Sequence, residues 1–270
     1  MPSNKGLDYF TPAGEPLKQL DPPITEQAVG PVPIFRSAGA YGTGTTQCTA
    51  AVPTGGAAPQ ANDTLVILAE STDSTTAAGT PNTPGGWSKL FERTRGDGLT
   101  GVTTLTIFGK RAGAGETDVT IDGVLNHISA RMFVVSGCVE TGDAWTVGSG
   151  NGADTGNGTC PSLTTPTDNC LVLAIGCSTR DNINSANFTL WTNANLSSLT
   201  ERGDNGTNVG AGGGIGVAMG GLALAGPTGN TTFQINVSDR WNAVHIALRP
   251  PEVAQAPRSS SMFRMRRATA

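Results

Sequence analysis

The chain has 270 residues, with 17 Lys and Arg against 21 Asp and Glu and a formal net charge of −4. Its 37 glycines and 17 prolines stay below the roughly 25–30 % of Gly and Pro typical of low-complexity chains, and the small net charge argues against disorder. The acidic balance also argues against nucleic acid as a partner. No apolar run approaches the ~20 residues that cross a bilayer, and no secretory signal is visible. We therefore expect a folded protein made in the cytoplasm, with no membrane partner.

Residues 1–34 predict an extended arm rather than a sheet or a long helix. Seven prolines fall in this stretch, and repeated prolines fix φ and remove backbone donors. Large apolar side chains are spaced along the arm, and we expect them to anchor the protein to a partner: Tyr9, Phe10, Leu17, Leu20 and Ile24. Because prolines limit the freedom lost on docking, the arm is expected to carry most of the attachment.

Between residues 35 and 250 the sequence predicts β-strands. Residues 103–108 are rich in Thr and β-branched side chains, and Phe233, Ile235 and Val237 alternate with polar residues. Apolar residues alternate in the same way from Ile128 to Val134. Clusters of Gly, Asn, Asp and Pro separate such runs at short intervals, which is typical of an all-β sandwich or barrel.

An internal repeat is the most informative feature of the sequence. Residues 62–69 resemble residues 168–175, and each segment is followed by a polar loop, a Trp and a further series of matching strands. Six elements recur in the same order, which indicates duplication of one β unit. We predict an internally duplicated antiparallel β-sandwich, jelly-roll-like, with about six strands per copy. The predicted copies are residues 35–145 and 146–250.

The repeat predicts which residues should superpose. The expected pairs are Leu65 with Leu171, Trp87 with Trp191, and Val119 with Phe233. The copies are either two separate sandwiches or two halves that share a core. Few residues lie between the copies, which favours close packing.

Residues 251–270 form a second tail, which is basic. It holds four arginines and no acidic residue after Glu252. Apolar residues are interleaved with the arginines, which suits docking on a protein better than on nucleic acid, with a simply solvated tail as the alternative. The expected partner-anchoring residues here are Phe263, Arg264, Arg266 and Arg267.

The five cysteines are expected to be buried, reduced thiols. They are Cys48, Cys138, Cys160, Cys170 and Cys177. Their number is odd, no two have the spacing of a zinc knuckle, and disulfides rarely persist in the cytosol. A metal site and a disulfide are the weaker alternatives.

The two histidines are expected to be structural or exposed. His127 aligns with Trp241 in the repeat, and His245 aligns with Arg131, so the histidines are not equivalent. Neither lies in a metal-ligand spacing. The chain also has no nucleophile elbow and no Walker loop. We therefore predict a protein that is not an enzyme and has no cofactor and no metal.

Three further features of the sequence are its acidic residues, two Arg-Gly-Asp triplets and a glycine-rich run. Acid pairs for glycoside hydrolysis would need to meet in space, and the available residues, Glu92, Asp97, Glu201 and Asp204, are more simply explained by turns. The two Arg-Gly-Asp triplets, at residues 95–97 and 202–204, are predicted to be duplicated hairpin turns rather than adhesion motifs. Residues 210–216 are glycine-rich, which predicts a flexible hairpin or a close approach of another backbone.

At residues 62–69, 84–87 and 241–250 the sequence resembles β-sandwich minor tail or decoration proteins of tailed bacteriophage virions. The resemblance covers residues 35–250 and implies a structural protein on the virion surface, with a minor tail protein favoured over a capsid decoration protein. It implies other virion proteins as partners and a symmetric homo-oligomeric assembly. The alternative is an adhesin that binds a host-surface glycan or receptor. Trp145 is its candidate sugar platform, since the other tryptophans are expected in the core.

Overall fold

The computed structural model describes residues 30–73, 77–96, 101–154, 156–179, 181, 187–236 and 239–252. Among these residues strands dominate, and the single helical segment is a 3-10 turn, η1 (Gly55–Ala57). The described residues form one compact unit. No helix in the described ranges is long and apolar enough to span a membrane. The fold is all-β, as the alternating, Thr-rich sequence predicts.

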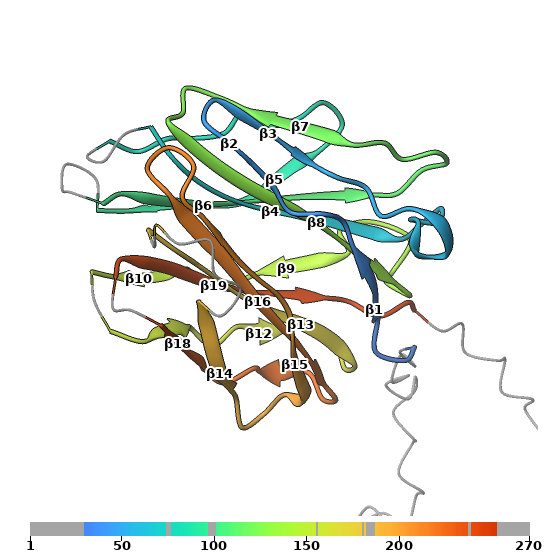
Figure 1. The fold of residues 1–270 in the computed structure, drawn as a ribbon. Helices are drawn as coiled ribbons and strands as arrows, with labels where there is room; N and C mark the ends of the chain where they lie inside the picture. The colour runs from blue at the N-terminus through green and yellow to red at the C-terminus, as the bar shows by residue number, and fades with distance from the viewer. Residues whose placement is uncertain are drawn as a thin grey trace, which may run out of the picture. The chain divides into compact units, whose positions relative to one another are not determined.

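The first large sheet is built from the first half of this unit (Figure 1). Its strands are β1 (Ile34–Ala38), β2 (Gly42–Gly44), β4 (Thr64–Thr72), β5 (Ser88–Arg95), β6 (Thr103–Arg111) and β8 (His127–Ser136). The antiparallel order is β1-β8-β4-β6-β5, and β2 pairs with the start of β8. All nine residues of the central strand β4 are buried, because other layers cover both faces of the sheet.

The second large sheet repeats this arrangement. Its strands are β9 (Trp145–Val147), β10 (Asn151–Ala153), β13 (Cys170–Ser178), β15 (Ser197–Thr207), β16 (Gly213–Leu222) and β19 (Trp241–Leu248). The order is β10-β19-β13-β16-β15, with β9 pairing the end of β19. Strands β13, β16, β15 and β19 thus take the places of β4, β6, β5 and β8. The predicted duplication of an antiparallel β unit is confirmed.

Smaller sheets cover the outer face of each large sheet. On the first copy β3 (Gln47–Ala50) pairs with β7 (Val119–Asp122). On the second copy β11 (Gly158–Cys160), β18 (Thr231–Ile235) and β14 (Phe188–Thr192) form a three-stranded sheet, and β12 (Thr164–Thr165) pairs with β17 (Gly226–Pro227). Each copy is therefore a sandwich of one large and one small layer.

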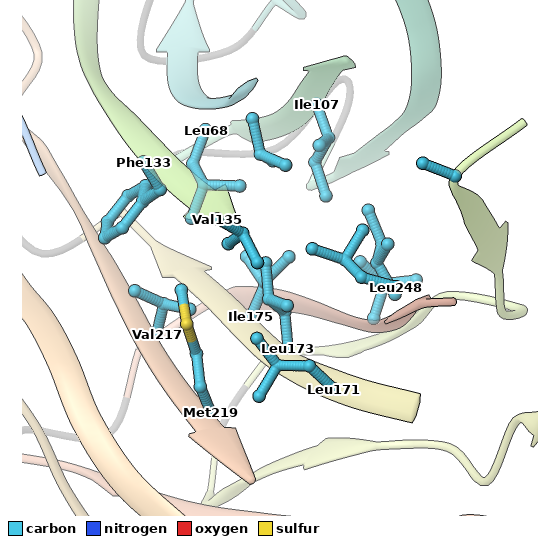
Figure 2. Close-up of a cluster of buried hydrophobic side chains, with 14 of the residues drawn as sticks. Leu68, Ile107, Phe133, Val135, Leu171, Leu173, Ile175, Val217, Met219 and Leu248 are labelled. Carbon is cyan, nitrogen blue, oxygen red and sulfur yellow. The ribbon is translucent and has the colours of Figure 1, made fainter. Parts of the chain in front are cut away.

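The two sandwiches pack through their large sheets and share a central core. Figure 2 shows Leu68, Ile107 and Phe133 of the first copy facing Leu173 and Val217 of the second. Each buried side chain of this size contributes ~1.5–3 kcal/mol. Separate outer clusters lie under the small sheets. Each copy thus has an outer core of its own and half of a common one, which combines the two arrangements that the sequence left open.

The predicted register between the copies is wrong by an odd number of residues. Leu65 faces the outer core of its copy, whereas Leu171 faces the central core, so they are not equivalent although their strands are. Matching Asn62 with Asn169 restores the correspondence of faces, and both residues have positive φ, 72° and 56°. A run of consecutive apolar residues carries no period-2 signal, because both faces of these strands are buried.

Two further predicted pairs also differ in position. His127 faces the central layer and Trp241 faces an outer core, so their alignment is wrong for the same reason. Trp87 directly precedes β5, while Trp191 lies in β14, although each packs in the outer core of its own copy. Val119 and Phe233 do lie in corresponding strands, β7 and β18.

Candidate functional site

The predicted partner-anchoring residues lie outside the described residues. These are Tyr9, Phe10, Leu17, Leu20, Ile24, Phe263, Arg264, Arg266 and Arg267. Val32, which belongs to the predicted arm, packs against the central core. The compact unit therefore begins before the expected boundary at residue 35.

The chain enters and leaves the compact unit at a single point. The amide of Gly30 donates a hydrogen bond to the carbonyl oxygen of Pro251 (2.8 Å), and the Asn169 side-chain amide donates to the Gly30 oxygen (3.0 Å). A Cβ at Gly30 would lie only 2.6 Å from Cγ of Pro251, so the glycine permits this close contact. Gly30 and Pro251 consequently lie side by side, near the first and last of the described residues.

A partly apolar groove of about 310 Å³ lies beside this point. Its residues come from β1 and the segment before it, and from β13, β15 and β16: Val32, Pro33, Ile34, Phe35, Leu171, Ser197, Ser198, Arg202, Met219, Gly220 and Gly221. The Ile34 side chain is 67 % exposed, and the Arg202 guanidinium lies 5.0 Å from the centre of the Phe35 ring. Such a surface offers both apolar area and a fixed positive charge.

The hairpin between β15 and β16 reaches across from the second copy to the first. In Figure 1 its turn lies beside the first large sheet. Gly210, at φ +65°, would collide through a Cβ with the carbonyl oxygen of Asn126, and Gly213 would collide with the carboxylate of Glu70. Close backbone approach, one of the two expectations for residues 210–216, is what the structure has here. We call residues 207–213 the glycine hairpin.

Under the glycine hairpin lies a buried polar cluster that sequence reasoning missed. His127 Nδ1 donates to the carbonyl oxygen of Val209 (2.8 Å), and His127 Nε2 lies 2.6 Å from Glu70 Oε2. Both side chains are fully buried. Thr103 donates to Glu70 Oε1 (3.0 Å), and its hydroxyl also lies 3.3 Å from the thiol of Cys177. The signal in the sequence was Glu70 itself, a lone acid inside an apolar strand.

The environment shifts the proton affinity of this pair. Burial raises the pKa of Glu70 above its ordinary value. Burial by itself would lower the pKa of His127, but the charge of Glu70 and the hydrogen bonds to Glu70 and Val209 together raise it. Both shifts favour the protonated side chains in the folded protein.

The remaining histidine and the cysteines are buried in other places. His245 Nε2 lies 2.7 Å from Thr231 Oγ1, and burial lowers the pKa of His245 to about 4. All five cysteines are buried and free, and burial raises the pKa of Cys177 to about 12. Among the described residues no group of three or more His, Cys, Asp or Glu side chains could hold a metal ion.

The two Arg-Gly-Asp triplets have different structures. Gly96 follows β5 with φ +84°, which suits a turn, and Asp97 lies outside the described residues. The second triplet lies within β15, so its prediction as a hairpin turn is wrong. Asp204 is buried there and accepts a hydrogen bond from the Phe188 amide (3.0 Å). Of the four acids considered for hydrolysis, Asp97 lies outside the described residues, and Glu201 lies near Asp204, whose pKa is raised by burial and also by the charge of Glu201.

The candidate sugar platform is also packed inward. Trp145 is half-buried and packs against the central core. The large hydrophobic side chains that are exposed in the described ranges are all aliphatic, namely Ile34, Val124, Leu190 and Leu224.

Comparison with known proteins gives no relative: no family model, curated protein or solved structure matches this chain.

Proposed function

We propose that the protein is a non-enzymatic structural subunit on the surface of a tailed-phage virion, held to tail or capsid proteins by its terminal segments. A minor tail position is favoured over capsid decoration. Support comes from the resemblance of residues 35–250 to virion β-sandwich proteins. The rigid, doubly layered sandwich, whose cores bury both faces of each large sheet, suits a scaffold that presents a surface.

The common starting point of the terminal segments carries this proposal. Because Gly30 and Pro251 are hydrogen-bonded, a partner that binds the arm is also within reach of the basic tail. The groove beside Ile34 and Phe35 adds apolar surface at the same place. One partner can therefore hold the subunit through three adjoining features.

Deletion of each terminal segment tests the attachment. Removal of residues 1–29 or of residues 253–270 leaves the Gly30–Pro251 contact in place. We expect loss of the arm to remove most of the protein from purified particles at every salt concentration. Loss of the tail should matter at low salt only, because salt screens its arginines.

A full-length control separates side-chain docking from arm length. It replaces Tyr9, Phe10, Leu17, Leu20 and Ile24 by Ser and keeps the prolines. This variant should detach like the arm deletion. Wild-type occupancy of the arm-deleted protein, with loss of the tail-deleted one, would make the C-terminus the anchor.

An adhesin is the second candidate, and an open polar groove favours it. The groove has a volume of about 620 Å³ and is lined by amide, carboxylate and hydroxyl groups, including Gln47, Thr80, Asn82 and Asp122. Such groups can bind the hydroxyls of a neutral glycan. Binding of the wild type and of Asn82→Ala to a glycan array tests this candidate. Binding that is lost in the variant supports the adhesin, and an array without binding of the wild type rejects it.

A further inference from the structure

The glycine hairpin contacts the first copy at Glu70 and His127. These two side chains must share a proton, for the following reason. His127 Nδ1 faces a carbonyl oxygen, which only accepts, so Nδ1 carries hydrogen. The other nitrogen, Nε2, faces a carboxylate oxygen at 2.6 Å. If neither atom carried hydrogen, two lone pairs would repel each other between fully buried side chains. The geometry therefore requires one further proton between Glu70 and His127, whichever of the two holds it.

We propose that the glycine hairpin is a latch between the two copies, which stays closed while Glu70 and His127 share this proton and opens in alkaline solution as the proton is released. The hairpin supplies the Val209 carbonyl to His127, and its glycines let the backbone lie against Asn126 and Glu70. When the latch opens, water reaches both side chains and each returns to its ordinary pKa. This proposal is independent of the attachment to a virion.

The sign of the pH dependence follows from proton counting. In the open state an ordinary Glu and an ordinary His hold almost no titratable proton above about pH 7.5. In the closed state the pair holds one, consistent with the raised pKa of each side chain. Closing thus takes up one proton, and the opening constant rises up to tenfold per pH unit until the closed pair itself titrates.

Other titratable groups near the pair do not give the same response. Tyr41 interacts with Glu70, and burial raises its pKa far above the range considered. Cys177 lies on the facing strand β13 and has a pKa of about 12. Asp181 adds a negative charge near His127. Asp204 lies on β15, and burial raises its pKa to about 7, so most of its titration lies below the range of pH 7.5 to 9.

Hydrogen exchange of the full-length chain between pH 7.5 and 9 tests the latch. The readout is protection of the β15–β16 amides in residues 205–215, corrected for the intrinsic pH dependence of exchange, with β4 as the internal reference. We expect the hairpin of the wild type to lose up to tenfold in protection per pH unit while β4 stays protected. Glu70→Gln should abolish this slope, because His127 alone takes up no proton in this range.

Glu201→Gln is the matched control, since it makes the same change on β15 away from the pair. It should keep the wild-type slope. The latch is rejected if the wild-type hairpin shows no slope, if Glu70→Gln keeps it, or if the hairpin loses protection only together with β4.

Gly210→Ala tests the same latch without altering a titratable group, in case Glu70→Gln does not fold. A methyl group at this position collides with the Asn126 carbonyl oxygen. The hairpin should then be poorly protected already at pH 6.5 and show little further loss above it. Full protection with an unchanged slope in this variant contradicts the proposal.

Discussion

Phe233 fills space that two glycines leave open in an outer core of the second copy. A Cβ at Gly158 or Gly176 would clash with the Phe233 ring. The ring also packs 4.5 Å from the centre of Trp191 and 5.7 Å from that of Phe188. Small residues opposite a cluster of large rings keep the layer at native packing density, so volume rather than backbone freedom explains these two glycines.

At the residue scale, Gly158→Ala should destabilise the protein by about 1–3 kcal/mol through overpacking. Urea denaturation followed by circular dichroism measures the change. Gly85→Ala is the control, because a Cβ there meets nothing within 4 Å, and its effect should stay within about 0.5 kcal/mol. Equal effects of the two substitutions would show that lost glycine flexibility, and not the Phe233 ring, sets the cost.

At the element scale, Asp204 connects the edge strand β15 to β14 of the small sheet. Its Oδ2 accepts the amide hydrogen of Phe188, the first residue of β14. Burial raises the pKa of Asp204 to about 7. Since the folded-state pKa is raised, the stability contribution is fully present below the unfolded pKa near 3.8 and is lost as the pH rises through 7. The ionised carboxylate is thus the costly form at this junction.

Asp204→Asn should therefore stabilise the protein in alkaline but not in acid solution. The amide oxygen can still accept from Phe188 and never ionises. We expect a gain of about 1–3 kcal/mol at pH 8 and little change at pH 4. Urea denaturation at the two pH values measures the difference. An equal effect at both would mean that the ionisation of Asp204 does not limit stability.

At the scale of the whole molecule, the two copies depend on each other through the central core. Each half by itself would expose an apolar face, such as Val66, Leu68 and Leu105 on the first sheet. Contiguous exposed apolar surface of this kind drives association. We therefore expect the two sandwiches to be stable when they pack together, and neither copy to be stable by itself.

Coexpression of residues 1–141 with residues 142–270 tests this dependence. The cut falls in an exposed loop. The fragments should copurify, and each should aggregate or self-associate when expressed alone. Leu173→Asp, on the central face, should prevent copurification, while Thr232→Asp, at an exposed position, should not. A soluble, monomeric single fragment would show that one sandwich is sufficient.

Much of the architecture follows from local sequence. The Thr-rich and β-branched composition of β6 predicted a strand, and the alternation of apolar and polar residues in β18 predicted another, whose burial alternates in the same way. The recurrence of six elements predicted the duplication. The glycines at 210–216 predicted a close backbone approach, because only a residue without Cβ permits it.

Other features were decided by tertiary structure alone. The register of β4 against β13 was not readable, since a strand buried on both faces has no alternation. The position of the second Arg-Gly-Asp triplet within β15 depends on its pairing with β16, where Gly203 lies opposite Val217 and Asp204 opposite Gly216. Glu70 and His127 are 57 residues apart and meet through the pairing of β4 with β8, and only the packing of one copy on the other brings the Val209 carbonyl of the second copy to Nδ1 of His127. Local sequence determines which face of a strand is apolar, but a contact between distant segments exists only once the sheets have stacked.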